Sequence, residues 1–129
     1  MQEKYYIGII LTTNQKIRLC LDSSVNTVLM VDEAHVLLGG RNELGAEFLA
    51  QMQRRSRKYN TGTIIITQQP TDFAAPNIIQ HGKAIFDNAS YYLVMGLRKQ
   101  AVEDLSQLID LNESEKESIK FYPQGQGLF

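Results

Sequence analysis

Continuous hydrophobic runs alternate along the chain with segments whose hydrophobic residues recur at helical spacing. The runs have the composition of strands covered on both faces, and they are residues 27–31 (TVLMV), 63–67 (TIIIT) and 91–95 (YYLVM). Helices are predicted between and after them, in residues 43–59, 76–88 and 98–109. Strands and helices in alternation are typical of an α/β fold, so the pattern predicts a parallel sheet with flanking helices.

Before the first of these runs, the sequence predicts an N-terminal β-hairpin. Tyr5–Leu11 is rich in β-branched and aromatic residues, and Lys16–Asp22 alternates apolar with polar positions. The residues between these two segments are polar, as a turn requires. We therefore expect two parts in the chain: a hairpin-like segment over 1–26 and an α/β part over 27–129.

The carboxy-terminal residues carry the signals of one more helix and one more strand. Asn112 is followed three residues later by Glu115, which is the spacing of a capping box and predicts a short helix to about Lys120. Leu128 and Phe129 have the character of the first residues of a strand.

Composition and charge narrow the class of protein. The 129 residues suffice for one domain, and 43% hydrophobic against 21% charged residues argue against disorder. The net charge of −1 argues against a polyanion-binding protein defined by bulk charge, although a local basic patch is compatible with it. The lone Cys20 excludes an intramolecular disulfide framework and favours a reducing, cytoplasmic setting. No apolar run approaches the ~18 residues of a membrane span.

The strongest candidate for chemistry is the pair Asp32 and Glu33, which directly follows the apolar run 27–31. An apolar strand ending in Asp-Glu has the form of a Walker B motif, in which the aspartate holds Mg²⁺ and the glutamate polarises an attacking water. Acidic residues also commonly follow strands in loops, so the pair alone leaves both interpretations open.

A glutamine at the end of a neighbouring predicted strand strengthens the functional interpretation. Gln68 follows residues 63–67, and ligands in open α/β sheets gather beyond the carboxyl ends of the strands. A glutamine there can orient the nucleophilic water in phosphoryl transfer. The alternative interpretation is that Gln68 is a solvated loop residue, which is the more common case for a glutamine after a strand.

A basic run, Arg54-Arg55-Ser56-Arg57-Lys58, lies near the end of the helix predicted between these two strands. Cations favour a helix C-terminus, and such a run is most often a solvated face. The functional alternative is that one or two of these arginines reach phosphates, including those of a neighbouring subunit.

Two other kinds of site are disfavoured. His35 and His81 lie far apart with no partner at ligand spacing, which argues against a zinc-type metal site. The tetrapeptide at 32–35, Asp-Glu-Ala-His, matches that of DEAH-box helicases. Those helicases carry a Ser-Ala-Thr type motif on the next strand, whereas this chain has Thr67-Gln68 there.

Four blocks of sequence, in this order and spacing, resemble the carboxy-terminal ATPase region of the VirB-four type, the motor ATPases of conjugation and type IV secretion. The blocks are VLMVDEAHVLL (28–38), FLAQMQRRSRKYNTGTIIITQQPTDF (48–73), NASYYLVMGL (88–97) and YPQGQGLF (122–129). The resemblance covers residues 27–129 and implies the C-terminal part of a RecA-like P-loop NTPase sheet. Residues 1–26 show no matching motif.

The resemblance also implies roles for individual residues. Asp32 takes the place of the Walker B aspartate that binds Mg²⁺, and Glu33 that of the catalytic glutamate. Gln68 falls on the glutamine of the family's Thr-Gln motif. A basic motif implied to reach ATP across a subunit boundary falls on three residues of this chain: Arg55, Arg57 and Lys58.

At the level of the whole protein, the resemblance implies a hexamer that uses ATP and Mg²⁺ on the cytoplasmic face of an inner-membrane secretion channel. The implied function is to couple ATP hydrolysis to pilus assembly and to the transfer of a DNA or nucleoprotein substrate. Two alternatives remain: a related hexameric DNA pump, of the coupling-protein or HerA/FtsK type, and a non-catalytic interaction module that retains the fold.

The chain departs from the family pattern in one respect that bears on both its sheet and its activity. It contains no G-x-x-x-x-G-K-[ST] phosphate loop. The resemblance places the strand that bears this loop between residues 63–67 and 91–95, so the sheet should have a vacant strand position. We expect a truncated gene product or a fragment whose vacant position is filled by Tyr5–Leu11 or by a second chain. We also expect the chain to be inactive alone, although the parent protein is an ATPase.

Overall fold

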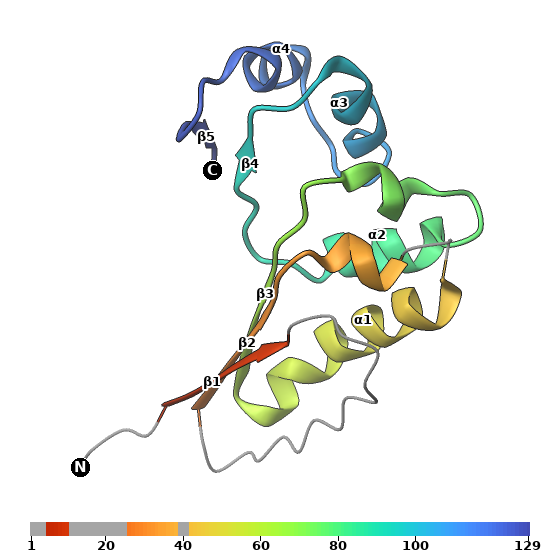
Figure 1. Ribbon diagram of the computed structural model, residues 1–129, viewed down its shortest axis with the longest axis vertical. Helices are drawn as coiled ribbons and strands as arrows, with labels where there is room; N and C mark the ends of the chain where they lie inside the picture. Colours follow the sequence, from red (N-terminus) through yellow and green to blue (C-terminus); the bar gives the residue numbers. More distant parts are fainter. Residues whose placement is uncertain (1–4, 11–25, 39–41) are drawn as a thin grey trace.

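The computed structural model describes residues 5–10, 26–38 and 42–129, which build an α/β arrangement (Figure 1). A parallel three-stranded sheet has the order β1-β2-β3. Its strands are β1 (Tyr5–Ile10), β2 (Asn26–Val31) and β3 (Thr61–Ile65). A separate antiparallel pair is formed by β4 (Val94–Met95) and β5 (Gly127–Leu128).

Helix α1 connects β2 with β3 and packs on one face of the parallel sheet, and the other helices follow later in the chain (Figure 1). The α-helices are α1 (Glu43–Ser56), α2 (Ile79–Asp87), α3 (Lys99–Leu105) and α4 (Glu113–Phe121). Single 3-10 turns are η1 (Ala34–Leu38), η2 (Arg57–Tyr59) and η3 (Pro70–Ala74). The predicted parallel α/β arrangement and the helices expected over 43–59, 76–88 and 98–109 are thus confirmed, although each α-helix is shorter than expected.

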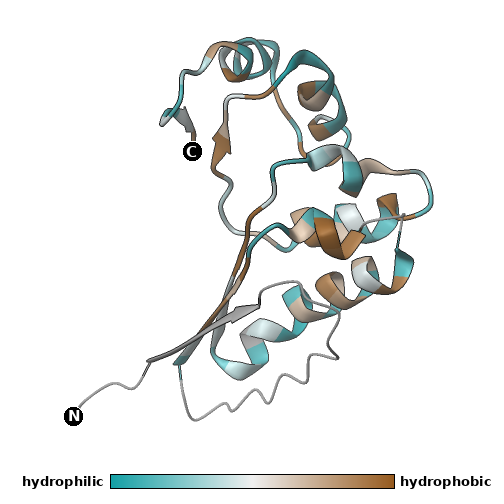
Figure 2. Ribbon diagram, in the orientation of Figure 1, coloured by the Kyte–Doolittle hydropathy of each residue, from teal (hydrophilic) through white to brown (hydrophobic). Residues whose placement is uncertain are grey.

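The hydrophobic core lies between the sheet and α1. Leu29 and Val31 of β2 are buried against the apolar side of α1, where Leu49 and Ala50 are also buried. Phe73 of η3 is 1% exposed and continues this core towards α2. Figure 2 shows that α1 and α2 carry both hydrophobic and hydrophilic residues. Buried residues of both helices, among them Leu49 of α1 and Ile85 of α2, belong to this one core. The helical spacing of apolar residues in α1 therefore has a direct cause, since one side of the helix is core.

The capping box predicted at the start of the last helix is confirmed. The Asn112 side chain accepts a hydrogen bond from the backbone N–H of Glu115 at 2.9 Å, and the Glu115 carboxylate accepts one from the backbone N–H of Asn112 at 2.8 Å. These bonds satisfy two backbone donors that would otherwise lack partners, which fixes where α4 begins.

The expectation that residues 63–67 and 91–95 are strands covered on both faces is wrong. Ile64 and Ile66 are 44% and 40% exposed, because the described residues cover only the face of β3 that carries Thr63 and Ile65. In the second run only Val94–Met95 is a strand, and Tyr91 is 77% exposed. This short strand, β4, pairs with β5, which confirms the strand predicted at Leu128.

The suggestion that Tyr5–Leu11 fills the vacant strand position is also wrong. β1 pairs in parallel with β2, with Ile10 in register with Val31, and so lies on the side of β2 away from β3. β3 and β4 do not pair with each other. Within the described residues, the second edge of β3 therefore has no partner strand. The predicted second arm of the hairpin, Lys16–Asp22, lies outside the described residues, and the division at residue 26 stays a prediction.

Gly82 of α2 provides a test of how closely α2 and η3 pack. A Cβ atom at this position would overlap the backbone carbonyl oxygen of Phe73. Helix propensity alone would make Gly82→Ala stabilising by roughly 0.5–1 kcal/mol. The overlap reverses that sign, so we expect Gly82→Ala to lower the free energy of unfolding in urea by about 1–3 kcal/mol.

The matched control is Lys83→Ala, at an exposed position of the same helix, where we expect a change within about 0.5 kcal/mol. Equal stability of the two variants would contradict the close packing of α2 on η3.

Candidate functional site at the carboxyl ends of β2 and β3

The candidate site is formed where β2 and β3 end side by side. Val31 is in register with Ile65, and the pairing continues one residue further. The backbone N–H of Ile66 donates to the carbonyl oxygen of Val31 at 2.8 Å, and the N–H of Ala34 donates to that of Ile66 at 2.9 Å. These two bonds fix the segment that carries Asp32 and Glu33 against the end of β3.

Glu33 and Gln68, which are 35 residues apart in the sequence, meet at this edge of the sheet. The Gln68 side-chain amide donates to the Glu33 carboxylate, with 2.6 Å between Nε2 and Oε1. The Glu33 side chain is 41% exposed, so the carboxylate also remains accessible to water. The prediction from strand ends that these residue types would come together is correct in geometry, while their catalytic roles remain predictions.

The backbone at Glu33 adopts a conformation that non-glycine residues rarely use. Its φ angle is +52°, in the left-handed region. The Asp32 carboxylate supports this turn, because its Oδ1 accepts a hydrogen bond from the Glu33 N–H at 2.8 Å. Backbone strain of this kind is often found at functional sites, and here it occurs at the residue whose side chain contacts Gln68.

His35 is a neighbour of Glu33 that the sequence interpretation missed. Its Nδ1 lies 3.3 Å from Glu33 Oε2, and this nitrogen is buried without a hydrogen bond in the described part of the chain. Histidines at metal-ligand spacing form a recognisable sequence pattern, whereas a single histidine two residues after a glutamate gives no such signal. The contact occurs where the backbone of Glu33 has a left-handed φ angle, which no sequence pattern here predicts.

The described residues contain no group of three or more metal-ligating side chains. Magnesium is commonly held by one or two carboxylates together with water and phosphate oxygens. Asp32, whose Oδ1 is occupied by the Glu33 N–H, fits such a role with its second carboxylate oxygen.

The basic run lies at the opposite end of the sheet. It precedes β3, and the carbonyl oxygen of Asn60 accepts a hydrogen bond from the N–H of Thr27 near the start of β2. At about 3.3 Å per residue, the six residues of β2 separate this end from Asp32 by roughly 20 Å. Arg55 and Lys58 are exposed there, and Lys58 Nζ lies 5.7 Å from the ring centroid of Tyr59. The structure thus does not bring these two residues to Glu33 within one chain. Arg57 lies in η2, in the same stretch of backbone.

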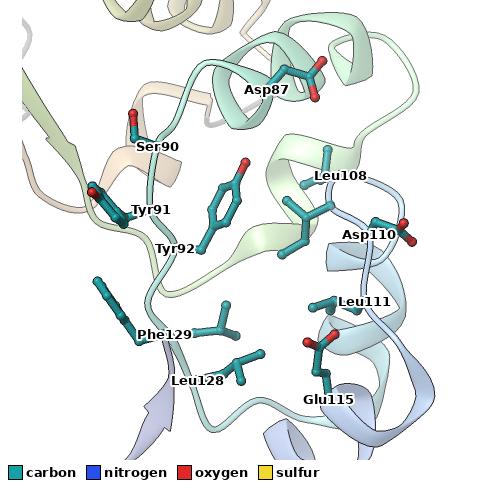
Figure 3. A pocket seen from close by; sticks show the side chains of 12 residues that line it. Asp87, Ser90, Tyr91, Tyr92, Leu108, Asp110, Leu111, Glu115, Leu128 and Phe129 are labelled. Carbon is teal, nitrogen blue, oxygen red and sulfur yellow. The ribbon is translucent and has the colours of Figure 1, made fainter.

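A cavity of about 530 Å³ lies away from this site, between the segment after α2, the segment after α3, and β5 (Figure 3). Its lining includes three aromatic and three acidic residues: Tyr91, Tyr92, Phe129, Asp87, Asp110 and Glu115. The Tyr91 and Phe129 rings stack with centroids 5.7 Å apart. Burial, and then the charge of Asp87, raise the pKa of Tyr92, so its hydroxyl stays protonated and donates to the carbonyl oxygen of Phe86 at 2.6 Å.

No helix within residues 26–38 or 42–129 is long and apolar enough to cross a bilayer.

Comparisons with known proteins show what this chain is similar to. No protein-family model matches the chain. The uncharacterized protein pXO2-09 of Bacillus anthracis is 23% identical over 107 residues, which cover 78% of this chain and 17% of that protein. The VirB4 structure from Thermoanaerobacter pseudethanolicus superposes with a TM-score of 0.73 at 34% identity, over 79% of this chain and 27% of that one. The chain thus spans only about a quarter or less of the length of these two relatives.

The strain at Glu33 can be measured by comparing two substitutions that both remove its carboxylate. Glu33→Ala keeps a Cβ atom in the left-handed conformation, whereas Glu33→Gly removes it. We expect the glycine variant to be more stable than the alanine variant by about 0.5–1 kcal/mol in denaturant unfolding.

The same pair of substitutions at Glu47, inside α1, is the matched control. There we expect the opposite order, with glycine less stable than alanine by about 0.5–1 kcal/mol. The same order at both positions would show that the backbone at Glu33 is not strained.

Proposed function

This chain is part of a VirB4-type ATPase region, and we propose that it supplies the half of an ATP site that holds the metal and positions the attacking water. The observation that carries the proposal is the hydrogen bond between Gln68 and Glu33 at the carboxyl ends of two parallel strands. Ligands of open α/β sheets bind at such an edge.

The proposed roles follow from the donors and acceptors at this edge. The Glu33 carboxylate is partly exposed and acts as the base that polarises the water. Gln68 donates from its Nε2 to Glu33, and its side-chain carbonyl oxygen can accept a hydrogen bond from the same water. Asp32 holds Mg²⁺, which neutralises charge on the phosphates when it is bound.

The other half of the site, the phosphate-binding loop, is absent from the sequence. Phosphoryl transfer depends on positioning and on charge stabilisation by such a loop and its lysine, so the chain alone lacks what holds the β- and γ-phosphates. We therefore propose a RecA-like sheet only for a complete protein in which a loop-bearing strand is added.

The basic residues act in this scheme on a neighbouring subunit. Arg55, Arg57 and Lys58 precede β3 at the end of the sheet away from Glu33, so contact with ATP bound at Glu33 requires a second chain. This supports the proposal of a hexamer in the complete protein. Its setting, at the cytoplasmic face of an inner-membrane channel in pilus assembly and in DNA or nucleoprotein transfer, is proposed from the family.

ATP hydrolysis tests the proposal, first in the isolated chain and then in a chimera. We expect negligible hydrolysis by the isolated chain. The chimera carries these residues in place of the matching region of the Thermoanaerobacter VirB4, and we expect Mg²⁺-dependent turnover. Glu33→Gln in the chimera should lower kcat by about 10²–10⁴-fold while ATP still binds, because the base is lost and the phosphate contacts are not.

The matched control is Glu47→Gln, an exposed glutamate on α1 that accepts a hydrogen bond only from Gln51 among the described residues, and it should leave turnover unchanged. A chimera without activity, or one that keeps its activity after Glu33→Gln, would contradict the proposal.

A further inference from the structure

His35 lies on η1, a short turn that is anchored on both sides of this residue. Before it, the N–H of Ala34 donates to the carbonyl oxygen of Ile66 at 2.9 Å. Ala34 is also buried, and Leu38 at the far end of the turn is buried in the same core. The backbone that carries the imidazole is therefore held against the end of β3.

The imidazole presents its Nδ1 atom to the Glu33 carboxylate. Nδ1 lies 3.3 Å from Glu33 Oε2, and it is buried without a hydrogen bond among the residues described. A carboxylate oxygen offers only lone pairs, so an unprotonated Nδ1 would set its own lone pair against them. A buried nitrogen without a partner is costly, and a small rotation of the ring aligns an N–H with Oε2. Both effects favour a proton on Nδ1.

The second oxygen of the same carboxylate is held from a different element. Gln68 Nε2 donates to Glu33 Oε1 at 2.6 Å from the end of β3, whereas His35 approaches Oε2 from η1. A long side chain that is 41% exposed would otherwise sample several rotamers. Contacts at both oxygens fix the plane of the carboxylate. An ionised carboxylate has about four lone-pair sites, so sites remain for a water molecule.

We propose that His35 is a positioning residue whose Nδ1–H donates to Glu33 and holds the carboxylate in the orientation in which it polarises the attacking water. This inference rests on the proposed function, in which Glu33 is the base. A general base works only within hydrogen-bond reach of the proton that it takes. A displacement of about 1 Å can lower the rate by about 10²-fold, so a group that fixes the base contributes to turnover through it.

The contact can be tested in the chain alone by long-range ¹H–¹⁵N NMR, which distinguishes the two neutral tautomers of a histidine. At a pH where the ring is neutral we expect the Nδ1–H form for His35, because the partner of a ring nitrogen sets the tautomer. Glu33→Ala removes the acceptor, and the Nδ1–H population should fall. The chain has one other histidine, His81 on α2, which is the internal control and should not respond to Glu33→Ala.

Turnover in the chimera with the Thermoanaerobacter VirB4 measures what the contact does. His35→Ala should lower kcat about 10–100-fold with KM for ATP little changed, because the carboxylate loses its orientation while the phosphate contacts remain. In the Glu33→Gln background the same substitution should cause no further loss, since His35 acts through Glu33. A purely structural role would lower turnover in both backgrounds. His81→Ala is the matched control and should leave turnover unchanged.

Two amide substitutions separate the roles of the two ring nitrogens. The side-chain nitrogen of asparagine can take the place of Nδ1, whereas that of glutamine reaches the place of Nε2. We therefore expect His35→Asn to keep most of the turnover and His35→Gln to lose about as much as His35→Ala. The reverse order would overturn the proposal, as would a His35→Ala variant with unchanged kcat.

The two kinds of measurement keep this inference distinct from the proposed function. An inactive chimera with His35 in place would contradict the proposed function, and the tautomer of His35 in the chain alone would then decide whether the contact is made. An Nε2–H tautomer would overturn the contact even if the chimera is active. If His35→Ala fails to fold by circular dichroism, the two amide variants and the tautomer decide.

Discussion

The parallel pairing of β2 with β3 is the constraint on which the candidate site depends. It sets Val31 beside Ile65, and the two hydrogen bonds through Ile66 extend the pairing past the end of both strands. Because α1 connects these strands and packs on the face of the sheet that carries Leu29 and Val31, the core and the site share one origin. The carboxylate and the amide meet because the strands that precede them are paired.

Much of this arrangement could be predicted from local sequence. The apolar run before Asp32 and the run before Gln68 are separated by a helical segment of the right length for a parallel crossover, and parallel strands end at the same edge. The capping box at Asn112 is equally local, since all of its atoms lie within four residues. Predictions of this kind succeed where neighbours in the sequence decide the structure.

The wrong predictions concern features of the structure that a distant part of the chain determines. An apolar run such as TIIIT is compatible with covering on one face or on two, and Ile64 shows that one face is open. The position of Tyr5–Ile10 beside β2 depends on the pairing of strands, which its own composition does not encode. The contact of His35 with Glu33 occurs at a left-handed φ angle, for which the sequence carries no glycine or asparagine signal.

The second edge of β3, which pairs with no strand within the described residues, bears on how a nucleotide site is completed. The backbone N–H and C=O groups of Ile66 are both bonded to the segment that continues β2, so those of Thr63 and Ile65 are directed to the other edge. A strand that ends in a phosphate-binding loop near Glu33 must run parallel to β3, because only parallel strands bring their carboxyl ends to the same edge of a sheet. Added at Thr63 and Ile65 in that direction, such a strand ends where Gln68 and Glu33 meet.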